Sequence, residues 1–181
     1  MLAELDVVVF LQSHDDLQRT AERVFGALHT SWSAATDEQV GDQYFAASGL
    51  GFSAGLYSNS DQRADPWFER YPYFIEITSR FWCVDLDSVD LEGPLSEYYG
   101  RMLAFGLDME SATAILVDTT EEGEWFEIVA YRRNPQYRLD QGPTTPKVVE
   151  IERRREFSSF EETEEWEEED FETVAADEPE E

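Results

Sequence analysis

The chain has 181 residues, of which 41 are acidic and 13 are lysine or arginine, so its formal net charge is −28. This charge argues against direct binding to nucleic acid or to an anionic membrane surface, because both need clustered basic side chains that release counterions. The length and the 41% hydrophobic content suffice for one domain with its own core. We therefore expect a globular protein whose partners are basic.

The first predicted element is a valine-rich run at residues 5–11. The run is far shorter than the roughly 20 residues that a membrane-spanning helix needs. It follows Glu4 and Asp6, where a signal peptide would carry basic residues. We expect a central strand buried on both faces, in a cytoplasmic protein without a membrane segment.

An amphipathic helix is predicted next, ending near His29. Ser13 and Asp16 form a variant of the capping box in front of it. Apolar side chains then recur at helical spacing and line one face, which predicts a helix packed against a sheet. The residues of this face are Leu17, Ala21, Val24, Phe25 and Leu28.

Two strands are predicted from alternating side chains, one from about Gly49 to Tyr57 and one from Tyr71 to Val84. We expect them to pair as an antiparallel hairpin. Cys83, the single cysteine, lies in the second of these strands. One cysteine permits neither an internal disulfide nor a cysteine metal cage, so Cys83 is interpreted as a plain core thiol.

The second half of the domain repeats the strand and helix rhythm. Pro94 in a first turn and Gly106 at the far end bound a second predicted helix. A hairpin of residues 112–118 and 124–131 follows it. The order is βαββαβ plus one strand, which predicts an α+β fold of the ferredoxin-like type, a two-layer sandwich with both helices on one face of one sheet.

The composition changes sharply near residue 140. Residues 141–146 contain Gly and two Pro and are predicted to be a linker between a globular domain, residues 1–140, and a tail, residues 147–181. The last 21 residues hold 13 acids and no base, which is typical of a flexible acidic C-terminal tail. Its aromatic side chains predict tail contacts with a partner, through Trp166 and Phe171.

Signals for catalysis or for a cofactor are weak. His14 and His29 lie near the two ends of the first predicted helix, and no serine stands in a nucleophile motif. Asp85, Asp87 and Asp90 lack the glycine and the distant glutamate of a calcium loop, so we interpret them as solvated acids. We therefore predict no enzyme, no metal and no cofactor.

The connection from Asn59 to Tyr73 is both acidic and aromatic. Loops between strands often carry binding residues, and aromatic side chains often anchor interfaces while acids steer basic partners. The alternative is that Trp67 and Phe68 fold back over the sheet edge. The predicted partner-binding residues are Asp61, Asp65, Trp67, Phe68, Glu69 and Tyr71.

The order of elements and the loop Asp65-Pro66-Trp67-Phe68-Glu69-Arg70-Tyr71-Pro72-Tyr73 resemble the small acidic immunity proteins of bacterial toxin systems. The resemblance covers residues 1–131, and the acidic tail has no counterpart in it. It implies a single-domain inhibitor that binds a cognate toxin, often a basic nuclease, and occludes its active site.

We therefore expect a non-enzymatic acidic binding protein that neutralises or escorts a basic protein partner. A first alternative is a nucleic-acid mimic that inhibits a DNA-binding protein through the tail. A second is a salt-adapted enzyme or small-ligand domain, which would have a concave pocket with converging polar groups.

Overall fold

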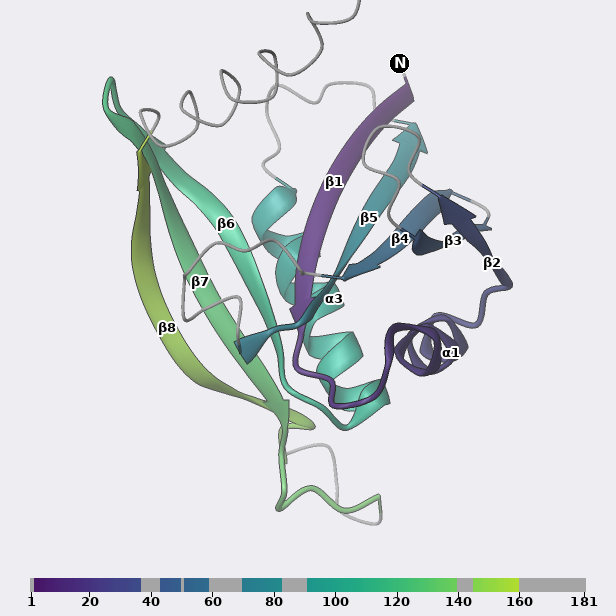
Figure 1. The fold of residues 1–181 in the computed structure, drawn as a ribbon. Helices are drawn as coiled ribbons and strands as arrows, with labels where there is room; N and C mark the ends of the chain where they lie inside the picture. Colours follow the sequence, from purple (N-terminus) through teal and green to yellow (C-terminus); the bar gives the residue numbers. More distant parts are fainter. Residues whose placement is uncertain are drawn as a thin grey trace, which may run out of the picture.

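The computed structural model describes residues 2–36, 43–49, 51–58, 70–82, 91–139 and 145–159, which form one eight-stranded sheet and two helices (Figure 1). The strands are β1 (Leu2–Leu11), β2 (Trp32–Thr36), β3 (Gln43–Gly49), β4 (Phe52–Ser58), β5 (Tyr73–Trp82), β6 (Ser111–Thr119), β7 (Gly123–Arg133) and β8 (Val148–Ser159), and the helices are α1 (Leu17–Ala27) and α3 (Glu92–Leu107). Neither of these helices is long and apolar enough to cross a membrane.

The sheet order is β2-β3-β4-β5-β1-β6-β7-β8, and its neighbouring strands are antiparallel. The predicted ferredoxin-like fold is therefore wrong. In that fold, the strands before and after each helix are parallel to each other and belong to the same sheet. Here the chain leaves β1, forms α1 and continues into β2 at the far edge of the sheet.

The error has a local cause in the segment after α1. Residues that we expected to contribute one strand form the β3–β4 hairpin, with Gly51 at a φ of 85° between the two strands. Glycine adopts such a left-handed conformation without steric cost. Strand β2, which precedes this hairpin, was not predicted, and the three strands together extend one side of the sheet.

Several single elements are confirmed. The run at residues 5–11 lies in β1, fifth in the sheet order, and the predicted second helix corresponds to α3. Helix α1 follows the predicted amphipathic pattern, but Asp16 alone caps it, accepting a hydrogen bond from the Arg19 amide at 2.8 Å. Ser13 instead shares a hydrogen bond with the Thr20 hydroxyl, at 2.8 Å.

Strand β8 lies in the segment that we expected to be tail. It pairs with β7 from Gly123 to Arg133, so the sheet continues past the expected linker. Arg153 of β8 contacts Glu127 at 2.6 Å and Glu150 at 2.9 Å. These ion pairs hold Arg153 to the sheet surface, and residues 160–181 lie outside the described part of the chain.

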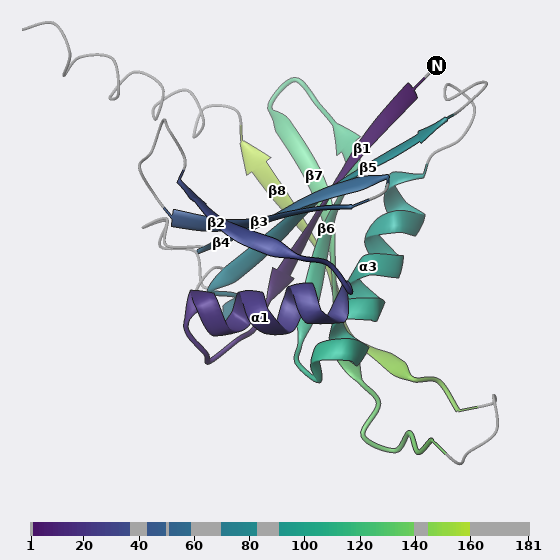
Figure 2. The ribbon, with the colours of Figure 1, turned by 90° about the vertical axis from the view of Figure 1, so that its right-hand side faces the viewer.

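Both described helices pack on one face of the sheet (Figure 2). We call this the helix-covered face. Its strands contribute fully buried aliphatic side chains, such as Val9 of β1 and Ile77 of β5, and the helices contribute Phe25 and Leu103. The main hydrophobic core therefore lies between the helices and β1, β3, β4 and β5.

Candidate functional site

A row of aromatic rings crosses the opposite face of the sheet, which we call the open face. The row consists of Tyr44, Tyr57, Phe74 and Phe10, from the adjacent strands β3, β4, β5 and β1. Tyr57 stacks on Tyr44 with ring centroids 4.8 Å apart and on Phe74 at 5.1 Å. Phe10 is tilted against Phe74 at 6.3 Å. The four rings are half-buried, so parts of them are accessible on this face.

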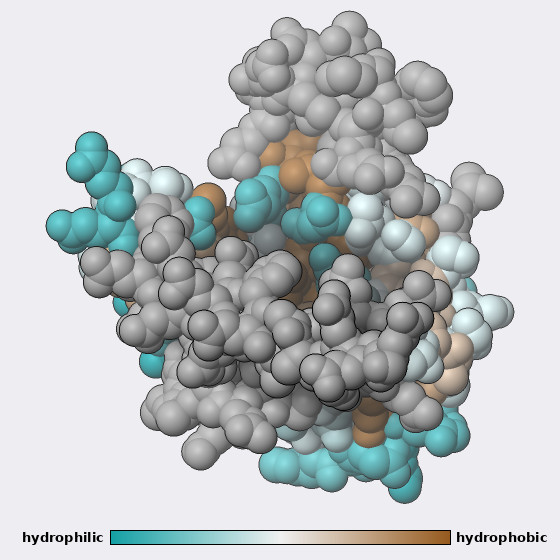
Figure 3. All heavy atoms as spheres, turned by 45° about the horizontal axis from the view of Figure 1, so that its top comes forward, coloured by the Kyte–Doolittle hydropathy of each residue, from teal (hydrophilic) through white to brown (hydrophobic). Residues whose placement is uncertain are grey.

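The row arises from strand alternation. On β1 and β5, even-numbered residues such as Phe10 and Phe74 point to the face of the sheet that is opposite to the face of the buried Leu11 and Ile75. Because side chains of neighbouring strands come into register, one aromatic residue on each strand is enough to build a continuous row. Figure 3 shows hydrophobic surface between hydrophilic side chains on the side of the molecule that it presents.

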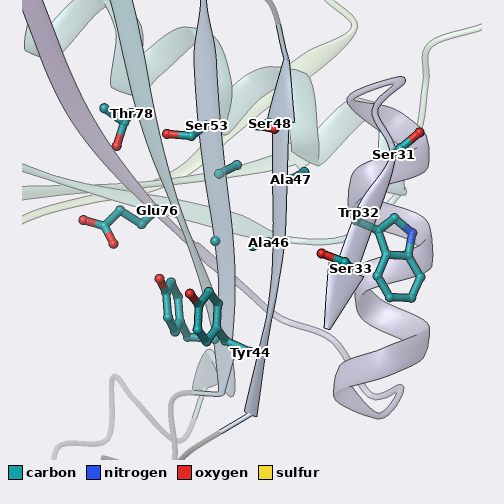
Figure 4. A pocket seen from close by; sticks show the side chains of 13 residues that line it. Ser31, Trp32, Ser33, Tyr44, Ala46, Ala47, Ser48, Ser53, Glu76 and Thr78 are labelled. Atoms are coloured by element: carbon teal, nitrogen blue, oxygen red, sulfur yellow. The ribbon is translucent and has the colours of Figure 1, made fainter. Parts of the chain in front are cut away.

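A shallow cavity of about 570 Å³ lies beside the tyrosine end of the row (Figure 4). Its floor consists of small side chains on β3 and β4, including Ala46, Ser53 and Gly55. Gly55 leaves room for the ring of Tyr57, because a Cβ atom at this position would lie 2.6 Å from that ring. The glycine therefore lets the Tyr57 ring lie close along its own strand.

Glu76 provides the charge of this cavity. It is exposed on β5, beside Gly55 in the strand register, and forms no hydrogen bond or ion pair within the described part of the chain. None of the described residues that line the cavity is basic. The cavity thus combines two stacked tyrosines with a carboxylate that is unpaired among the described residues, a combination suited to a cation.

The predicted loop contacts are placed only in part. Five of the predicted loop contacts lie outside the described residues: Asp61, Asp65, Trp67, Phe68 and Glu69. The predicted tail contacts, Trp166 and Phe171, and the predicted core thiol, Cys83, also lie outside them. Their roles stay predictions.

Tyr71, the sixth predicted loop contact, is described and has 0% of its surface exposed. Its hydroxyl donates a hydrogen bond to a carboxylate oxygen of Glu110 at 2.6 Å. Burial, and then this hydrogen bond, raises the pKa of the Tyr71 phenol well above its ordinary value. In this structure Tyr71 therefore packs inside the molecule and anchors the end of the loop.

Arg70 completes this anchor. Its guanidinium contacts Glu110 of the chain before β6 and Glu152 of β8, the latter at 2.6 Å. It also lies over the ring of Tyr71, 5.4 Å from the centroid. These contacts tie the residues that lead into β5 to the other half of the sheet.

The described residues offer little for catalysis. They contain no cluster of three or more His, Cys, Asp or Glu side chains that could hold a metal ion. His14 and His29 are both exposed, in separate positions before and after α1. The predicted absence of a metal, a cofactor and an enzymatic activity stays a prediction.

The open face was missed as a site because its parts come from four strands. Alternation in the sequence already placed Phe74 and Glu76 on one face of their strand, but β3 and β4 were not separated. Tyr44 and Tyr57 could not be aligned with Phe74 without that hairpin.

Comparison of the chain with family models, with curated proteins and with solved structures gives no match.

Proposed function

We propose that this protein is a non-enzymatic binding protein that neutralises or escorts a basic protein, as an immunity-type inhibitor does with a basic toxin. The observation that supports this proposal is the Glu76 carboxylate, which no described residue pairs with, beside the stacked Tyr44 and Tyr57 on the open face. An arginine or lysine of the partner would place its cation against the tyrosine rings and pair with the carboxylate.

The distribution of charge supports two separate contributions to binding. The described ranges hold 18 acidic and 12 basic residues, a net charge of −6, whereas the remaining residues hold 23 acidic residues and one basic residue. The total of −28 would attract a basic protein over a long range and speed its association. The open face would then supply the short-range contacts that select one partner.

The short-range contribution is tested with a dye-labelled arginine–glycine peptide and two variants with the same charge change. Glu76→Gln removes the carboxylate in the cavity, and Glu22→Gln removes an exposed carboxylate on α1, on the helix side. By fluorescence anisotropy in about 150 mM salt, we expect Glu76→Gln to weaken binding about fivefold to tenfold, as the loss of a charge-assisted hydrogen bond should. Glu22→Gln should change it less than twofold.

Equal losses in the two variants would contradict the proposed site, because binding would then follow net charge alone. Affinity capture from the native lysate with the same two variants extends the test to the natural partner. A basic protein retained by Glu22→Gln and lost from Glu76→Gln would agree with the proposal.

The long-range contribution has its own test in the loop that the sequence singled out. Neutralising Asp61, Asp65 and Glu69 together should slow association with the captured partner and flatten its dependence on salt. An unchanged association rate would exclude this loop as the source of steering.

A further inference from the structure

A second cleft gathers positive charge in this acidic chain. It has a volume of about 920 Å³ and lies where β1 and β7 end, at the lower end of the molecule in Figure 1. Of the chain's 12 arginines, four line it: Arg23, Arg132, Arg133 and Arg138. Such a concentration is unexpected in a chain of net charge −28, and it lies away from the cavity of Glu76 on the open face.

The carboxylates of this cleft are already engaged by cations. Asp15 accepts a hydrogen bond from Arg23 at 2.9 Å, and Asp108 lies 3.8 Å from Arg133. Glu110, the third lining carboxylate, contacts Arg70 outside the cleft. The acids therefore neutralise part of the positive charge but not the whole of it.

Among the described residues, Arg132 provides a positive charge in the cleft that no carboxylate neutralises. Its side chain is exposed at the end of β7 and has no hydrogen bond or ion pair to the residues that the structure describes. The adjacent Arg133 lies over the ring of Phe105, 5.1 Å from its centroid, which fixes its direction. Arg132 and Arg133 both line the cleft where this strand ends.

A buried asparagine organises the turn that brings the fourth arginine. Asn134 donates hydrogen bonds to the carbonyls of Lys147 and Pro146 at 2.9 and 2.8 Å, and its side-chain oxygen accepts one from the Gln136 amide at 2.9 Å. Within the turn, the Arg138 guanidinium donates to the carbonyl oxygen of Tyr137 at 3.0 Å. The same guanidinium nitrogen also donates to the carbonyl oxygen of Pro135 at 2.9 Å, so the turn orients this exposed side chain.

We propose that this cleft binds a small organic phosphate. A guanidinium group presents paired N–H donors that match phosphate oxygens, and a phosphate dianion needs more than one such group. The volume is that of a small-molecule site and exceeds the needs of a bare ion. Tyr137 and Met109 line the same cleft and offer apolar contacts to the organic part. The chain's net charge opposes a long polyanion such as nucleic acid, so the ligand is small.

The test is a titration of the full chain at constant ionic strength, in which isothermal titration calorimetry measures binding. Three probes are used: inorganic phosphate, glycerol phosphate and citrate. We expect saturable binding of one glycerol phosphate per chain, weaker binding of inorganic phosphate and the weakest binding of citrate. Arg132→Gln should weaken glycerol phosphate binding about tenfold. Arg155→Gln is the matched control and should leave glycerol phosphate binding unchanged, because Arg155 is an exposed arginine of β8 that has no ion pair with the described residues.

Each other result overturns the proposal. Citrate binding as tightly as glycerol phosphate would show a general anion site, and equal losses in Arg132→Gln and Arg155→Gln would show binding outside the cleft. The absence of saturation with any of the three probes would mean that no ligand site exists there. Far-ultraviolet circular dichroism of both variants verifies that each is folded.

Discussion

The two faces of the one sheet differ in what their side chains do. On β1, Val9 and Leu11 face the helices and are fully buried, whereas Phe10 between them faces the other way and is half-buried. The helix-covered face joins aliphatic side chains into the main core. On the open face, Phe10 packs against a smaller buried cluster around Tyr71 and Ala112. At the other end of this face, Tyr44 and Tyr57 lie beside the Glu76 carboxylate, which has no partner among the described residues. The difference teaches that one strand sequence can stabilise the fold with one set of residues and present a binding surface with the other.

The largest expected change in the free energy of unfolding comes from a pair of substitutions at adjacent residues of β5, which point to different faces of the sheet. Ile77→Ala removes a fully buried side chain from the helix-covered face and should lower the free energy of unfolding by about 3 kcal/mol. Thr78→Ala changes the open face and should lower it by less than about 1 kcal/mol. Urea unfolding of both variants measures the two values, and similar losses would contradict the division between the faces.

Glycine-to-alanine substitutions compare a tightly packed position on α3 with an open position on α1. In Gly100→Ala, the new Cβ would lie 2.9 Å from the ring of Tyr131 and 3.0 Å from the methyl group of Thr113, beneath α3. We expect this crowding to cost about 1–3 kcal/mol of unfolding free energy. Gly26→Ala, whose Cβ would meet no atom within 4 Å on α1, should instead stabilise by about 0.5–1 kcal/mol. Thermal unfolding that shows gains at both positions would exclude tight packing of α3.

Alkaline pH tests the anchor at Tyr71. Because burial raises the pKa of its phenol, the folded protein keeps a proton that the unfolded chain releases above pH 10. Stability should therefore be full below about pH 10 and fall as the pH rises further, by at most about 1.4 kcal/mol per pH unit for this group. Burial also raises the pKa of Tyr73 and Tyr131. Tyr71→Phe should reduce the slope of stability against pH between 10 and 12 without abolishing it, and an unchanged slope would contradict burial of this phenol.

The smallest expected effect on stability comes from the same methyl addition on the open face. In Gly55→Ala, the Cβ would displace the ring of Tyr57, which is the far end of a flexible side chain. The free energy of unfolding should fall by less than about 1 kcal/mol, because a half-buried ring can shift. Binding of the arginine–glycine peptide should weaken, since the stack on Tyr44 is disturbed. A variant that binds like the wild type would show that the tyrosine stack does not form the site.

Local patterns were sufficient for single elements and failed for their assembly. The continuous apolar run that contains Val9 predicted a strand, and the spacing of apolar residues in α1 predicted a helix; both elements are present. The sheet order depends on the position of β1 between β5 and β6 and on the pairing of β8 with β7, which join residues far apart in the sequence. The strand β8 is also rich in charge, with Arg153 held by ion pairs, so its composition resembles that of a tail.

The candidate sites depended on the same assembly. Tyr44, Tyr57 and Phe74 become a row only after three strands are placed in register. Likewise, Arg23 and Arg132 are more than a hundred residues apart in the chain and meet where strand ends converge. Charge, by contrast, was visible at once in the sequence, which explains why a basic partner could be expected before any site was known.

The central claim, that the open face binds a basic segment, is tested most directly by NMR of the isotopically labelled full chain. Amide shifts are followed during titration with the arginine–glycine peptide, and the ¹⁵N resonances of β4 and β5 are compared with those of α1. The account predicts saturable shifts concentrated around Gly55 and Glu76, with those of α1 unchanged. Shifts spread over all acidic segments, or confined to residues away from the open face, would contradict it.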